Sequence, residues 1–532
     1  MSRAITSYTP SVLKDLWLFD VLIILVVTSL VLFARHRANR LRTRPRPGPP
    51  GLPVVGNLFD FPTTDPCLAA AKWKEQYGDI TFLNILGTTM VYLHSVEAVK
   101  DLLVKRGAIY SDRPPLIMVT ELCAFQPAVL GSYDDKLRRQ RALMDRVLGA
   151  ATVPTYHPLL ELETCGLLQR LIDSTEDYGV SITRYASTLS LLVVYGHRVT
   201  SNDDEMLVTA KEITDLLSNE ILAAPPKGIW AVDVFPLLKY IPSWFPFASF
   251  KRKAEVWREQ IVPFIERPLQ EVKKKVAEGT AIHSFCSLIL QEEQESMTAE
   301  KDYDVKWAAN TIVTGSIDTI STVVQHTLLL MLLHPEKFSR AREEIDNIVK
   351  GRLPTFADRA SLPFTECVLS EVIRLAAPIP LGLPHRLRQD DFYDGYLIPK
   401  DSVVIANIVG MLRDEKLYSD PEAFIPERFE STIVDEATRK ARDPRQWAFG
   451  FGRRRCPGVH LADSSTWLAL VSIVATLDVT KVIDMHGNTI EPEVKFDNFI
   501  FRLPNKFACR IEPRSKYHEA IIANAGLSAT IQ

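Results

Sequence analysis

A single cysteine stands in a short loop rich in glycine and arginine, residues 449–458 (FGFGRRRCPG), directly before an apolar segment, 460–479, that predicts a helix. Cationic side chains and a helix N-terminus both favour an anion, so we expect the Cys456 thiol to be held as a thiolate. A lone cysteine is a poor zinc site but suits the axial position of a haem iron. Glycines would let the backbone approach a flat cofactor, with Phe449 packed on it. The alternative is a buried free cysteine in an arginine-rich turn.

A second group with chemical potential lies in a long apolar segment, residues 304–334, which predicts one helix of about 45 Å at 1.5 Å per residue. Its centre, residues 315–320, reads GSIDTI and combines small residues with an acid, Asp318, and an alcohol, Thr319. Oxygen activation needs protons from a positioned acid or a water chain, and a threonine hydroxyl can bond a helix carbonyl. We expect Asp318 to relay protons and Thr319 to donate a hydrogen bond. The alternative is a capping pair at a kink in the helix.

At the cysteine loop the chain resembles the cytochrome P450 family, the haem-thiolate monooxygenases. Phe449, Gly452, Arg454, Cys456 and Gly458 fall on that family's haem-loop pattern. The resemblance implies heme b as cofactor, with Cys456 as the axial ligand of the iron and Arg454 as a donor to a haem propionate.

An ExxR pair, Glu371 and Arg374, lies on a predicted helix over 363–376. Spacing of three residues puts both side chains on one helix face, where they can pair; a solvated surface pair is the alternative. Arg428 follows in a Pro-Glu-Arg-Phe segment. The resemblance joins Glu371, Arg374 and Arg428 in a buried network under the haem, with a structural role.

Two further positions match propionate donors of the family, His385 and Arg141. Three positions depart from its pattern: Leu137 replaces a Trp, Ser316 replaces a Gly, and Ile320 replaces a frequent second Thr. Loss of the Trp donor is expected to cost about 1–3 kcal/mol of haem binding.

Composition limits the remaining possibilities. The 532 residues are 46% hydrophobic and 24% charged, which is typical of a globular protein with a large core. The net charge of −3 gives no reason to expect a nucleic-acid partner. Seven scattered cysteines, an odd number, favour a reducing compartment over a disulfide framework.

The N-terminal region predicts a membrane anchor. Residues 16–34 are apolar apart from a few polar positions such as Asp20, and a run rich in arginine follows at 35–46. The length approaches that of a bilayer span, and the positive-inside rule places the following chain in the cytosol. We expect a lumenal segment, 1–15, and a single-pass protein of the endoplasmic reticulum membrane. A cleaved signal peptide is the alternative.

The pattern along the chain favours a mainly α protein with small β-sheets (α+β), as in the P450 fold. Strands are expected at 81–85, 90–93 and within 395–407, and mostly helices between 95 and 340. The expected division is a basic, proline-rich hinge over 35–53, a catalytic domain over 54–513 and a flexible tail over 514–532.

Partners follow from length and from the resemblance. The chain has no room for a fused flavin reductase, so electrons are expected from an NADPH–cytochrome P450 reductase, with cytochrome b5 as an additional donor. The resemblance implies insertion of one oxygen atom of O₂ into a lipophilic small molecule, and residues 384–386 and 395–400 look most like fungal secondary-metabolism members. Ile379, Leu381, Gly382 and 499–501 would line the pocket. A haem-thiolate isomerase or dehydratase and a non-catalytic membrane haem protein are the alternatives.

Residues 225–246 form another apolar stretch, in which Trp230, Phe235, Trp244 and Phe245 stand among prolines. Its composition allows two interpretations. Such a loop either dips into the bilayer beside the anchor or packs on its own core.

Overall fold

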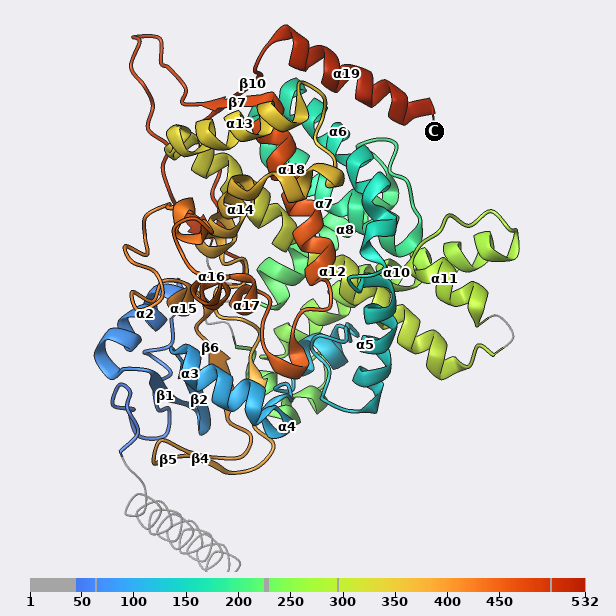
Figure 1. Ribbon diagram of the computed structural model, residues 1–532. Helices are drawn as coiled ribbons and strands as arrows, with labels where there is room; N and C mark the ends of the chain where they lie inside the picture. The colour runs from blue at the N-terminus through green and yellow to red at the C-terminus, as the bar shows by residue number, and fades with distance from the viewer. Residues whose placement is uncertain (1–44, 63–64, 224–228, 294–295, 498–499, 532) are drawn as a thin grey trace, which may run out of the picture.

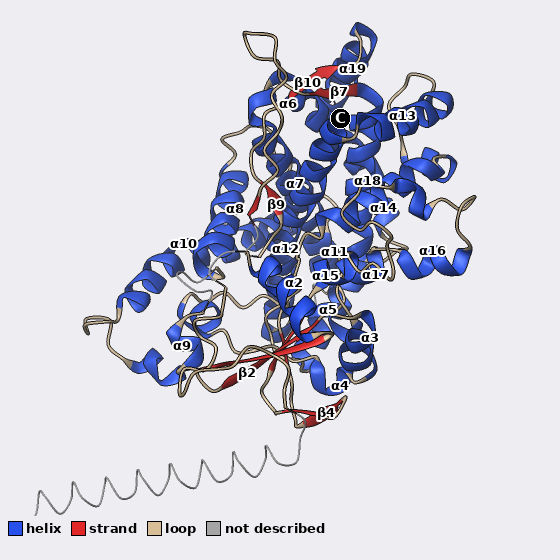
Figure 2. Ribbon diagram, turned by 90° about the vertical axis from the view of Figure 1, so that its left-hand side faces the viewer, coloured by secondary structure: helices blue, strands red, loops and turns tan. Residues whose placement is uncertain are grey.

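The computed structural model describes residues 45–62, 65–223, 229–293, 296–497 and 500–531. Helices form most of the molecule, and the strands gather in small sheets (Figure 1, Figure 2). This architecture confirms the predicted mainly α fold with small β-sheets. The predicted anchor, 16–34, the lumenal segment before it and the basic part of the hinge lie outside the described residues.

The helices of ten or more residues build the body of the molecule. In chain order they are α2 (Pro66–Tyr77), α5 (Asp135–Leu148), α6 (His157–Asp173), α7 (Tyr178–Tyr195), α8 (Glu205–Asp215), α10 (Ser249–Ala277), α12 (Ala299–Leu333), α13 (Pro335–Val349), α14 (Pro363–Ala376), α18 (Val459–Thr476) and α19 (Lys516–Ile531). Shorter helices connect them: α3 (Val96–Val99), α4 (Gly107–Tyr110), α9 (Ala231–Val234), α11 (Phe285–Glu292), α15 (Ile408–Leu412), α16 (Glu436–Arg442) and α17 (Arg445–Ala448).

The largest described sheet has the strand order β1-β2-β6-β3, formed by Ile80–Ile85, Thr88–Leu93, Val403–Ala406 and His385–Arg386. β1 and β2 form the predicted hairpin, with Ile80 opposite Leu93, and β6 pairs in parallel with β2. The two-stranded sheets are β4 (Asp391–Tyr393) with β5 (Tyr396–Ile398), β7 (Leu477–Thr480) with β10 (Arg510–Pro513), and β8 (Phe496–Asp497) with β9 (Leu503–Pro504).

The end of the proline-rich segment is fastened to this sheet. The Phe82 N–H of β1 donates to the Pro47 carbonyl at 2.7 Å. A Cβ at Gly48 would lie 2.1 Å from the Phe82 carbonyl oxygen, so this approach requires glycine. The chain is therefore anchored to the sheet from about residue 47, before the expected start of the catalytic domain at 54.

The long helix α12 runs through the core and contacts α5, α7, α14 and α18 (Figure 1). Its N-terminus is capped by the Thr298 side chain, which accepts from the Lys301 N–H. Both α12 and α18 are long and apolar enough to span a membrane, but 78% of the relevant window of each is buried inside the protein. They are core helices. α12 carries Asp318 and Thr319, and α18 follows directly on the loop that holds Cys456.

Two expectations from sequence are wrong at the C-terminal end. The helix expected over 460–479 ends at Thr476, because residues 477–480 pair as β7 with the distant β10. The tail expected to be flexible forms α19, which packs on α6 and buries Ile522 completely.

Candidate functional site: a cavity closed by the cysteine loop

The functional residues meet at an apolar cavity of about 300 Å³. Its walls come from α5, α8, α12, the segment after α14 and the cysteine loop before α18. The sequence-predicted residues on the wall are Arg141, Thr319, Ile379, Gly382, His385, Phe449, Arg454, Cys456, Gly458 and Phe501. Leu381 does not line the cavity and packs between the clusters around the sheet. Phe499 lies outside the described residues.

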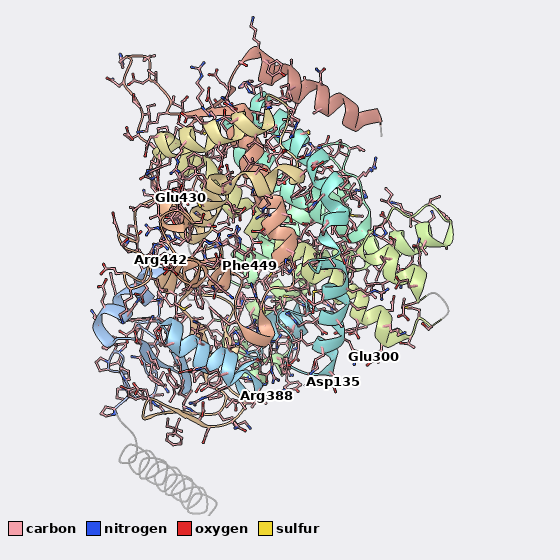
Figure 3. The ribbon with its side chains drawn as sticks, viewed as in Figure 1. Asp135, Glu300, Arg388, Glu430, Arg442 and Phe449 are labelled. Carbon is pink, nitrogen blue, oxygen red and sulfur yellow. The ribbon has the colours of Figure 1, made fainter. Side chains whose placement is uncertain are left out.

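The loop that carries Cys456 is held by its own backbone. The Cys456 N–H donates to the Phe449 carbonyl at 2.8 Å, and the Gly450 N–H donates to Trp447 at 3.1 Å. Figure 3 places Phe449 near the centre of the molecule. The surface of Cys456 is exposed to the cavity, because its side chain lies on the cavity wall.

The cations and the helix terminus near Cys456 act on its thiol as expected, but burial opposes them. Burial raises the pKa of this thiol, while the Gly458 N–H, Arg141 and Arg455 lower it by less. A bound metal ion would lower this pKa, as metal ions do at thiol ligands.

Gly452 lets the loop approach another part of the backbone, whereas the loop glycines were expected to approach a flat cofactor. Its φ is +51°, and a Cβ there would lie 2.5 Å from the carbonyl oxygen of Leu103. The glycine thus lets the loop approach the helical turn at Lys100–Lys105, and Gly452 is not on the cavity wall.

Behind the loop, Glu371, Arg374 and Arg428 form a buried ionic network. Arg374 donates two bonds to Glu371, at 2.7 and 2.8 Å, and Arg428 donates a third at 3.0 Å. The remaining guanidinium N–H groups donate to the backbone carbonyls of Leu412, Ser419, Asp420, Pro421 and Ala423. These carbonyls belong to residues 412–423, so the network fixes the path of the chain between α15 and α16.

Three arginines give the cavity wall a positive character. Arg454 donates to the carbonyls of Ser111 and Gly131, and Arg113 donates to those of Leu383 and Pro384. Burial lowers the pKa of Arg113 to about 9 and that of Arg454 to about 10. Arg141 lines the same wall.

His385 is held as a neutral ring. Its Nδ1 lies 2.8 Å from the Tyr110 carbonyl, and burial together with Arg113 and Arg454 lowers its pKa well below the usual range. No Asp or Glu among the described residues lines the cavity. Buried cations require a counter-anion, so the wall fits a ligand with carboxylates, such as the two propionates of haem. An apolar cavity, a thiol and these cations together fit that cofactor.

Arg141 reaches the cavity because α5 is docked on α12. Arg139 pairs with Asp304 at 2.6 Å and with Glu300 at 2.8 Å, and Gln140 also donates to Asp304. Figure 3 shows Asp135 and Glu300 close together where the two helices meet. Leu137, at the position of the family's Trp, lines the cavity as an apolar residue.

The side chains of Asp318 and Thr319 on α12 point in different directions. Thr319 lines the cavity, and its hydroxyl donates to the Gly315 carbonyl at 2.9 Å, as expected. Asp318 does not line the cavity and accepts a bond of 2.8 Å from the Ser218 hydroxyl. Ser316 turns its hydroxyl toward α7, where it bonds Ser190 at 2.5 Å. The Ser316 departure thereby ties α12 to α7.

Asp318 makes a testable contribution to stability. Burial raises its pKa to about 6, Ser218 lowers it by less, and Asp215 adds to the rise. A raised pKa means that the fold favours the protonated acid, so this contribution is complete below about pH 4 and is lost as pH rises through about 6. Relative to Asp318→Asn, the wild type should lose about 2–3 kcal/mol of unfolding free energy between about pH 4 and pH 7. Urea unfolding of both proteins measures this; parallel pH profiles would contradict it.

Sequence patterns do not reveal many residues of the wall, among them Arg113, Thr214 and Ser218. Arg113 follows Asp112, whose carboxylate accepts a hydrogen bond from Arg386. In the sequence, the adjacent Asp and Arg are only a weak indication of this buried ionic cluster. Thr214 and Ser218 lie on α8 and the turn after it, Leu216–Ile221, and belong to no motif.

The fold and the site fit a haem-thiolate protein, because Cys456 and the long helix α12 line the same apolar cavity. Comparison with known proteins identifies the family. A model of the cytochrome P450 family matches residues 46–504. The chain belongs to the cytochrome P450 family, whose members bind haem through a cysteine thiolate.

Curated relatives cover nearly the whole chain. The cytochrome P450 monooxygenase claT of Ampulloclitocybe clavipes is 38% identical over 94% of this chain and 96% of its own length. The cytochrome P450 monooxygenase 136 of Postia placenta is 37% identical over 91% of this chain and 92% of its own. The tryptamine 4-monooxygenase of Psilocybe cyanescens is 34% identical over 93% of this chain and 98% of its own.

Proposed function

We propose that this protein inserts one oxygen atom of O₂ into a C–H or C=C bond of a lipophilic small molecule, with electrons from an NADPH-dependent P450 reductase. The observation that carries the proposal is the apolar cavity that has the Cys456 thiol and the Thr319 hydroxyl on one continuous wall. Fungal relatives named as monooxygenases, including one named for tryptamine, support a role in fungal secondary metabolism.

The chain's own residues divide the work. Cys456 would ligate the iron, and Arg113, Arg141 and Arg454 would hold the propionates. His385 would donate from Nε2 once a propionate beside it favours the protonated ring. When bound, haem supplies the redox chemistry that cleaves O₂, and a thiolate ligand favours that cleavage. The network around Glu371 would serve a structural role, holding residues 412–423 behind the site.

Proton delivery is assigned to the pair on α12. Thr319 would present its hydroxyl to the oxygen side of the cavity, and Asp318 would exchange protons with water through Ser218. An acid with a pKa of about 6 can both gain and lose a proton near neutral pH, which suits a relay.

Thr319→Ala tests this assignment. Haem content and the thiolate spectrum should be retained, while a larger share of the NADPH consumed should appear as hydrogen peroxide and less as product. Thr322→Ala is the matched control. The Thr322 hydroxyl donates to the Asp318 carbonyl, one turn earlier in the same helix, and Thr322 does not line the cavity. Equal coupling of NADPH to product in both variants would refute the role of Thr319.

Membrane attachment is part of the proposal. Large apolar side chains are exposed over 235–247: Leu237 is 79% exposed, Trp244 78% and Phe247 91%. Val54 and Phe59, near the start of the described chain, are 91% and 70% exposed. Figure 2 shows α9, which precedes the 235–247 segment, at the end of the molecule that carries the four-stranded sheet. Such a surface supports contact with a bilayer beside the predicted anchor, at the endoplasmic reticulum, with the catalytic domain in the cytosol.

The carbon-monoxide difference spectrum of the reduced, membrane-bound protein is the first test. A far-red-shifted Soret band is expected from thiolate ligation, and oxygenated product should form only with NADPH and reductase. A thiolate band with reductase-independent turnover would instead indicate an isomerase or dehydratase. A thiolate band without any product across a lipophile panel would indicate a non-catalytic haem protein.

A further inference from the structure

Four charged side chains form an ionic cluster between α14, α17 and α18, outside the cavity. Arg445 is the first residue of α17, and Asp463 lies in the second turn of α18. Glu366 is on α14, and Arg359 is on the helical turn before it, Phe356–Ser361. None of the four lines the cavity, so the site described above does not account for them.

Each arginine of this ionic cluster bridges both acids. Arg445 donates to Asp463 at 2.6 Å and to Glu366 at 2.7 Å. Arg359 pairs with Asp463 at 2.7 Å and donates to Glu366 at 3.1 Å. The four side chains are between 16% and 35% exposed, so solvent screens these ion pairs only in part. Burial alone would raise the pKa of Asp463, but Arg445 and Arg359 together lower it, so this carboxylate stays charged.

α17 carries the first end of the cysteine loop. The loop begins directly after α17 with Phe449, whose carbonyl accepts from the Cys456 N–H at 2.8 Å. Trp447 of α17 packs against Phe451 of the loop with 6.3 Å between the ring centroids, and both residues are buried. A shift of α17 would therefore move the residues that hold Cys456.

α18 carries the second end of the loop, because it begins at Val459, directly after the loop. Arg445 at the first end and Asp463 at the second end are bonded to each other, and Arg445 also bonds Glu366 and the Ser370 hydroxyl of α14. α14 contacts both α17 and α18, as well as the core helix α12 (Figure 1). The two ends of the loop are thus joined to each other and to one core helix.

We propose that Arg445 is a positioning residue for Cys456, because its bonds to Asp463 and Glu366 set the separation of the two ends of the loop and so the placement of the thiolate ligand. The inference rests on the proposed haem ligation and adds a residue that controls its strength. Groups behind a metal ligand commonly orient it and tune the metal in this way. Arg359 bonds the same two acids but, among the described residues, no part of α17 or the loop.

The test compares Arg445→Gln with Arg359→Gln in the haem-loaded protein. Each change removes one positive charge and leaves each acid with one arginine, so the two melting temperatures should fall by similar amounts. Only Arg445→Gln releases α17. Well below the melting temperature, its ratio of thiolate-type to non-thiolate carbon-monoxide band should fall about tenfold, equivalent to about 1.4 kcal/mol, and that of Arg359→Gln should equal the wild type. Arg445→Lys keeps the charge and should recover part of the ratio.

The reduction potential of the iron is a second readout that does not depend on turnover. A thiolate that donates less strongly stabilises the oxidised iron less, so the potential of Arg445→Gln should be higher than that of Arg359→Gln. Because both variants lose one cation, comparing them removes the general effect of charge. Redox titration with mediator dyes measures the difference.

Two results would overturn the assignment of Arg445. They are an Arg445→Gln band ratio equal to that of Arg359→Gln, and equal reduction potentials in the two variants, because either would leave the ionic cluster with a general stabilising role only. Failure of the proposed function would look different, since the thiolate band or NADPH-dependent turnover would then be missing in the wild type itself.

Discussion

Cys456→Ala is expected to remove the thiolate-type carbon-monoxide band and to reduce NADPH-dependent product formation to background. The reason is that alanine offers no ligand for the iron, and no other cysteine of the described residues lines the cavity. The fold should persist, since the loop is held by backbone bonds such as that from the Cys456 N–H to Phe449. Absorption spectra, turnover and circular dichroism measure the three effects.

Cys165→Ala is the matched control for this change. Cys165 is partly buried on α6, and its thiol donates only to the Glu161 carbonyl of the same helix. The spectrum and turnover of this variant should equal those of the wild type. A thiolate-type band that survived in Cys456→Ala would show that another residue ligates the iron.

Glu371→Gln is expected to lower the free energy of unfolding by about 3–5 kcal/mol, because it leaves two buried guanidinium groups without their anion. Glu371 and Arg374 are both completely buried, so water cannot replace the lost charge. Haem content should fall with stability, because haem would bind only the folded protein. Urea unfolding and the haem-to-protein ratio measure both effects.

The control for the network is Glu436→Gln. Glu436 and Arg439 also lie three residues apart on a helix, α16, but their pair is at the surface. No measurable loss of stability is expected there. Glu371→Asp, which keeps the charge, should recover part of the stability. If both glutamine variants behaved alike, the buried network would have no special structural role.

Sequence patterns could predict the elements whose signals are local. The helix expected over 363–376 has those bounds in the structure, because Pro363 stands at its first turn and apolar residues recur at helical spacing behind it. Similarly, the β1–β2 hairpin follows from two β-forming runs around Gly87. The resemblance also named the residues of the cavity wall that carry its chemistry, among them Arg141, Thr319 and Cys456.

Features that depend on distant partners were not predictable. Residues 477–480 continue the apolar pattern of α18, and only the approach of β10 makes them a strand. Residues 516–531 are rich in small side chains, and their helix is stabilised by burial of Ile522 against the body of the protein. Thr214 belongs to no motif. Only the packing of α8 beside the other walls brings it to the cavity.

The cations of the cavity wall also bear on how the protein is produced. Arg113, Arg141 and Arg454 lie on one wall without a lining carboxylate among the described residues, so their mutual repulsion opposes closure of this region before an anion arrives. A ligand that binds only the folded state stabilises it in proportion to the logarithm of its concentration. We therefore expect that feeding a haem precursor during expression raises the yield of folded protein, which the haem-to-protein ratio and the soluble yield would measure.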